Sequence, residues 1–163
     1  MGKDVKRRGG RSTLMREMLL PLSTEKVRSL SLEHHMALAM VRSGNGDCDQ
    51  VICLLRVVYL AFFMRGETTS GSGLDLYRRA EFVLDACIAR AERGEPWTLR
   101  ADELADVGRV LVVHDEQLAA IPKHRYLAAW DRLQRFVTGG GQSPIPVEGA
   151  WRSPYADNPR LER

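Results

Sequence analysis

The sequence predicts an all-α fold: a small antiparallel bundle of about four main helices, with short N-terminal helices and an irregular C-terminal tail. Apolar residues recur at helical spacing in several segments, and glycine- or proline-rich connections separate them. A chain of 163 residues fits one domain and can bury a core without disulfides or metal. We therefore expect a disordered basic arm at residues 1–11, a helical bundle at 12–138 and a Gly/Pro-rich irregular tail at 139–163.

The first ordered elements are predicted to be short. Pro21 ends an apolar turn, and Ser23 is placed to cap a second turn that ends near Ser29. Ser31 then caps a longer helix, which Gly44 stops.

The segment "SGNGDCDQ", residues 43–50, has two interpretations. Its alternating polar residues resemble the start of a calcium loop, but such a loop would need glycine at position 50 and glutamate at position 56. The chain has Gln50 and Arg56 there, so a cation would lose its strongest ligand and meet a positive charge. The favoured interpretation is a turn in which Asp47 caps the next helix and Gln50 completes a capping box.

The next segment, residues 50–65, is the most apolar part of the chain. Its apolar run of residues 51–64 contains Arg56 and is shorter than the roughly 20 residues that cross a bilayer, so no membrane contact is expected. We expect the buried central helix here. A β-strand stays open as an alternative because the segment is rich in Val, Ile, Tyr and Phe, although no partner strand is evident.

Three more helices follow. After the loop at residues 66–73, helices are expected at about 74–93, 100–121 and 122–138, the first two with apolar residues spaced three and four apart. "GGG" ends the last helix. The apolar side chains of the tail that could still dock are Ile145, Trp151 and Tyr155.

No catalytic or cofactor motif occurs in the sequence. It lacks H-E-x-x-H, a Walker loop, G-x-S-x-G and G-x-G-x-x-G, and we expect no cofactor and no metal. His34 and His35 are adjacent, so on a helix they point about 100° apart and cannot share one metal ion. Three cysteines without C-x-x-C spacing and an N-terminus without a signal sequence predict free thiols and a cytoplasmic protein.

Some polar residues lie in otherwise apolar segments and form a possible buried polar site. Arg56 interrupts the central helix and needs a carboxylate, which Glu33 or Asp85 could supply; the alternative is an anion or partner site. A histidine on an apolar seam is usually a hydrogen-bonded core residue, but a small-molecule or metal site remains an alternative. The residues of this possible site are Arg56, His114, Asp115 and His35.

Charge is concentrated at the N-terminus. Residues 1–11 hold five basic side chains against Asp4, a net charge of +4, while the rest of the chain is close to neutral. Such an arm suits nucleic acid or an acidic protein surface. We therefore predict a non-enzymatic binding or regulatory protein; a structural protein that forms a homo-oligomer through helices 74–93 and 100–121 is an alternative. The candidate nucleic-acid-binding residues are Lys3, Lys6, Arg7, Arg8 and Arg11.

The segments "LSLEHHMALAMVRSGNGDCDQVICLLRVVYLAFF" and "HDEQLAAIPKHRYLAAWDRLQRF" resemble a group of small, uncharacterised helical proteins from proteobacteria and their mobile elements, some labelled Fis-like regulators. The resemblance covers residues 12–138 and implies a regulatory role. A Fis-type DNA-binding half ends in a helix-turn-helix with basic recognition residues. The last helices here carry Trp130, Asp131 and the "GGG" stop instead.

Overall fold

The structure, a computed structural model, describes residues 15–147. Within this range it is helical, without a β-strand, and residues 15–19 form one short helix ahead of the five long ones. The all-α prediction is confirmed, and the alternative of a strand at residues 51–64 is wrong. The long helices are α2 (Thr24–Arg42), α3 (Cys48–Phe63), α4 (Leu74–Glu92), α5 (Ala101–Ala120) and α6 (Lys123–Gly139).

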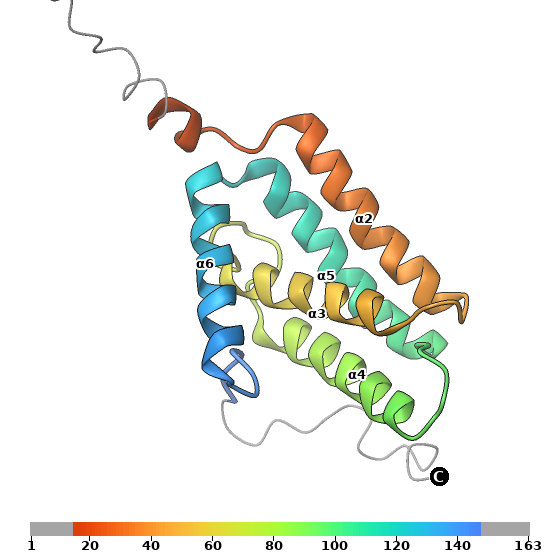
Figure 1. Ribbon diagram of the computed structural model, residues 1–163. Coiled ribbons are helices and arrows are strands. Elements are labelled where there is room, and N and C mark those ends of the chain that lie inside the picture. The colour runs from red at the N-terminus through yellow and green to blue at the C-terminus, as the bar shows by residue number, and fades with distance from the viewer. Residues whose placement is uncertain (1–14, 148–163) are drawn as a thin grey trace, which may run out of the picture.

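Four of these helices form an antiparallel bundle. Figure 1 shows α2, α3, α4 and α5 running in alternating directions, with α6 crossing the end of the bundle. α3 packs against each of the other four long helices, and α2 and α5 close the ring. The predicted central helix is therefore confirmed, and the seam between α2 and α5 is formed by helices far apart in sequence.

The core consists of the apolar faces that the sequence pattern indicates. On α4, for example, Tyr77, Ala80, Leu84 and Cys87 are fully buried. The apolar faces of helices 74–93 and 100–121, which the sequence also offered for self-association, pack inside the bundle, and self-association stays a prediction.

The N-terminal helix is longer than predicted. Ser23 is its N-cap and accepts a hydrogen bond from the backbone N of Lys26 at 3.2 Å, as expected. The predicted break between Ser29 and Ser31 is wrong, since α2 continues through both serines. Nothing between them interrupts the backbone hydrogen bonds, and a serine costs a helix interior only a fraction of 1 kcal/mol.

The turn before α3 matches the capping interpretation. Asp47 Oδ1 accepts from the backbone N of Asp49 at 2.8 Å, and Gln50 Oε1 accepts from the backbone N of Asp47 at 2.8 Å. Gly44 has φ +76°. Gly46 is needed for a close approach, because a Cβ there would lie 2.9 Å from the Cα of Val41.

The chain after α6 packs back onto the bundle. Gly140 ends α6 in the left-handed conformation, Ile145 is only 4% exposed, and Arg78 donates to the carbonyl of Pro146. Docking of Ile145 is thus confirmed, whereas Trp151 and Tyr155 lie outside the described residues. Among helices within residues 15–147, none is long and apolar enough to cross a membrane.

Candidate functional site

The structure divides the predicted polar site in two. His35 on α2 lies beside Asp115 on α5, and His114 lies one residue away in the core. Arg56 is exposed on α3 instead, where it lines a cavity formed with α4 and α6. The expectation that Arg56 is buried and paired with Glu33 or Asp85 is therefore wrong: position 56 falls on the edge of α3 that its neighbours leave open, and it forms no ion pair within residues 15–147.

Two histidines meet in the interior between α2 and α5. The rings of His34 and His114 have centroids 5.4 Å apart, and His114 is fully buried. Nδ1 of His114 lies 3.3 Å from Oε1 of Gln117, whose Nε2 donates to the carbonyl of Ala61 at 3.0 Å. Since the amide oxygen accepts, Nδ1 of His114 carries the proton.

The protein interior keeps these rings neutral. Burial, and secondarily the neighbouring His34, lowers the pKa of His114 to about 4. Burial also lowers the pKa of His34. Nδ1 of His34 and Nε2 of His114 have no hydrogen-bond partner among the described residues, which makes this pair a costly polar element of the core.

At the surface, the side chains of His35 on α2 and Asp115 on α5 form a contact between the same two helices. Nε2 of His35 lies 2.8 Å from Oδ2 of Asp115, and both side chains are accessible to solvent. The sequence places these two residues 80 positions apart, and the contact exists because α2 and α5 are neighbours. As predicted, the adjacent His34 and His35 face different surroundings.

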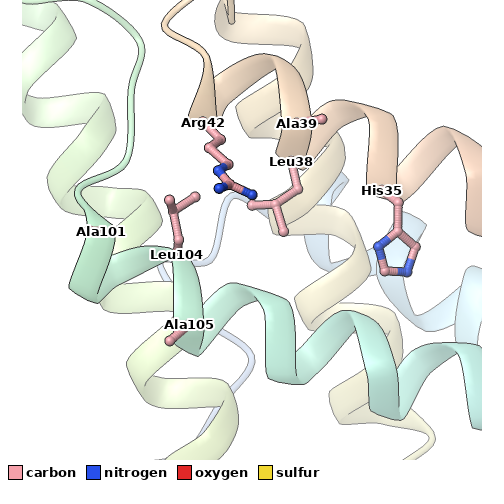
Figure 2. Close-up of a pocket in the computed structure, with 7 residues that line it drawn as sticks. All are labelled: His35, Leu38, Ala39, Arg42, Ala101, Leu104 and Ala105. Atoms are coloured by element: carbon pink, nitrogen blue, oxygen red, sulfur yellow. The ribbon is translucent and has the colours of Figure 1, made fainter.

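A groove of about 550 Å³ runs along the seam from this pair toward the end of α2. Figure 2 shows the Arg42 side chain reaching across it toward Leu104, with the His35 ring directed at α5 farther along. This lining contains no serine, threonine or cysteine. The lining residues of this α2–α5 groove are His35, Leu38, Ala39, Arg42, Ala101, Leu104 and Ala105.

α2 also exposes a row of large apolar side chains, Leu32, Met36 and Met40, which we call the α2 stripe. Their exposed fractions are 62%, 56% and 39%. Residues spaced by four lie on one face of a helix. A second surface hollow, shared with α3, lies beside Met36 and Met40. The outward face of α2 thus carries an apolar ridge with a depression on each side.

Basic side chains follow the α5 side of the stripe. Arg28, His35 and Arg42 recur every seven residues, or about two helical turns, so they lie along one line. Neither arginine forms an ion pair with any residue from 15 to 147. These cations are available to a partner molecule.

Sequence reasoning missed the buried ion pair between α4 and α5. Arg90, 5% exposed, donates to both carboxylate oxygens of Glu103, 3% exposed, at 2.9 and 2.8 Å. The same guanidinium donates to the carbonyl of Thr98, and Glu103 accepts from the backbone N of Arg100. A signal existed: Arg90 is three residues after Cys87 on the apolar stripe of α4, so it faces inward.

The part of the chain that the structure describes has no group of three or more His, Cys, Asp or Glu residues that could hold a metal ion. Cys48, Cys53 and Cys87 are free thiols, as predicted. The arm residues Lys3, Lys6, Arg7, Arg8 and Arg11 lie outside the described range.

Comparison of the chain with protein-family models, with curated proteins and with solved structures finds no match.

Proposed function

We propose that this protein is a non-enzymatic binding protein of regulatory type that presents α2 to an acidic amphipathic helix of a partner protein. The α2 stripe is the observation that carries the proposal. Exposed apolar residues gathered in one place commonly mark interaction sites, and methionines adapt to the shape of a partner. All three cysteines are free thiols, and that of Cys48 is exposed, which supports a reducing cytoplasmic setting.

The chemistry of the partner follows from what surrounds the stripe. Leu32, Met36 and Met40 offer anchor contacts at the spacing with which an amphipathic helix packs. Arg28 and Arg42 border this surface on the side of α5 without ion pairs in the described range, which favours carboxylates on that flank of the partner, whereas Glu33 and Asp49 line the hollow on the side of α3. The α2–α5 groove next to Arg42 can take one apolar side chain of such a helix.

A pair of synthetic helical peptides tests this proposal. Both carry leucines along one face; one has glutamates on its flanks and the other has lysines. We expect the glutamate peptide to bind the full chain at least about tenfold more tightly. Met36→Glu should abolish that binding because it puts a charge into the apolar contact, whereas Val137→Glu, on the equally exposed Val137 of α6, is the matched control.

Equal binding of the two peptides would reject an acidic partner, and equal loss in the two variants would reject α2 as the docking surface. Light scattering of the free protein tests whether the α2 stripe instead binds a second copy of the chain. If α2 pairs with a second copy of the chain, the apparent mass doubles and Met36→Glu restores the monomer.

The basic arm supports a second candidate, contact with nucleic acid. Five basic side chains within eleven residues favour salt-dependent binding that is independent of base sequence. About five phosphate contacts predict a slope near −4 when the logarithm of the binding constant is plotted against that of the salt concentration. Deletion of residues 2–11 should remove most of the affinity; binding that is insensitive to salt or to this deletion would exclude the arm.

A further inference from the structure

A cavity outside the α2–α5 seam lies between α3, α4 and α6. Its volume is about 340 Å³, within the range of pockets that hold small molecules. Ile52 of α3 and Leu133 and Phe136 of α6 form an apolar lining. Phe136 is held in place by an edge-to-face contact with Tyr59, with ring centroids 5.4 Å apart. The cavity therefore has a shaped, aromatic side.

The same cavity carries charges of both signs. Arg56 and Asp85 line it from different helices, and the two do not form an ion pair with each other. Neither has another ion-pair partner among residues 15–147. A molecule that carries charges of both signs can therefore contact both side chains from within this cavity.

A second carboxylate, Glu81, adds to the negative charge near Asp85. Glu81 lies one helical turn before Asp85 and accepts a hydrogen bond from the Tyr59 hydroxyl at 2.9 Å. Asp85 itself is exposed to solvent, and partial burial of its carboxyl, followed by the charge of Glu81, raises the pKa of Asp85 to about 6. Both causes would be relieved by a positive group placed near Asp85, so the site favours an ammonium there.

We propose that this cavity binds a small zwitterion with an apolar side chain, of which an α-amino acid such as L-phenylalanine or L-leucine is the simplest type. Its carboxylate contacts Arg56, its ammonium contacts Asp85, and its side chain packs on Leu133 and Phe136. This site is independent of the proposed docking on α2, and either can fail without the other.

Calorimetric titration of the full chain near pH 8, where Asp85 is ionised, tests the proposal. The probes are L-phenylalanine and L-leucine, phenethylamine and 3-methylbutylamine without the carboxylate, 3-phenylpropionate and 4-methylpentanoate without the ammonium, and glycine without the side chain. We expect one of the two apolar amino acids to bind at least about tenfold more tightly than each of its incomplete analogues, since each charged contact contributes about one factor of ten or more.

Three variants assign the contacts. Arg56→Gln should remove the preference for the amino acid over the amine, and Asp85→Asn should remove the preference over the acid. Arg42→Gln, which changes an exposed arginine of the other groove, should alter neither. No heat with either amino acid at about 10 mM would overturn the proposal. The same holds if an incomplete analogue binds equally well, or if the preferences survive both variants.

Discussion

His114 occupies a core position in which only its neutral form is stable. In the unfolded chain it takes up a proton near its ordinary pKa of 6.5, whereas in the folded protein it does so at about 4. As pH falls between these values, the unfolded state binds the extra proton first, so stability is lost by about 1.4 kcal/mol per pH unit. The stability that depends on a neutral His114 is therefore fully present above pH 6.5 and is lost below about pH 4.

We therefore predict that His114→Leu flattens the acid side of the stability curve. Urea unfolding between pH 7 and pH 4.5 should show a loss smaller than that of the unmodified protein by about 2 kcal/mol. The two proteins share the same carboxylates, so the pH-dependent stability that these contribute cancels when one curve is subtracted from the other. Parallel curves would show that His114 is accessible to protons in the folded state.

Asp47 gives a second prediction for a single residue. Asp47→Ala removes the acceptor that holds the backbone N of Asp49 and should lower the free energy of unfolding by about 1 kcal/mol. Asp49→Ala is the matched control, because it removes a first-turn charge but keeps the cap, and should cost less. Calcium should leave the melting temperature unchanged; a rise would restore the calcium-loop interpretation.

At this scale the sequence predicts some sites well and others badly. The seam position of His114 follows from its spacing among apolar residues, and the structure buries it fully. The exposure of Arg56 depends on which edge of α3 its neighbours cover, and a single helix pattern does not contain that information. The contact between His35 and Asp115 likewise requires knowing that α2 and α5 are adjacent.

Among the helices, the connection from α4 to α5 depends on the buried pair of Arg90 and Glu103. Glu103→Gln leaves the guanidinium without its counter-charge, and we predict a loss of about 3 kcal/mol in the free energy of unfolding. Arg90→Met together with Glu103→Leu should recover much of this loss, because no buried charge is then left unpaired. If the double variant is less stable than the single one, the pair contributes net stability by itself.

Helix positions were predictable because periodicity and caps are local. The helices expected near 74–93 and 100–121 appear at Leu74–Glu92 and Ala101–Ala120. The N-terminal helix was divided wrongly, since Ser31 has the chemistry of a cap and only the continuing hydrogen bonds of α2 show that it is not used. A residue with capping chemistry marks a helix end only where the backbone also departs from helical φ and ψ angles.

For the described residues as a whole, the alternating bundle follows from five amphipathic segments joined by short connections, and it leaves the α2 stripe exposed on the surface. α4 and α5 bury the faces that resemble association surfaces, while α2 keeps Leu32 and Met36 in solvent. The sequence pattern could not distinguish these cases, because each helix shows apolar spacing and only the assembled bundle reveals which residues are left outside. A protein that uses this surface loses binding, and not stability, when the α2 stripe is changed.

The most direct test places a photo-crosslinking amino acid at position 32, 36 or 40 of the full chain in its own cells, with position 137 as the exposed control. After illumination, mass spectrometry of the adducts should show one partner protein joined at all three α2 positions and absent at 137. The joined peptide should be an amphipathic segment with acidic flanks. Adducts that are equally abundant at position 137, or that join only peptides without acidic flanks, would contradict the proposed function.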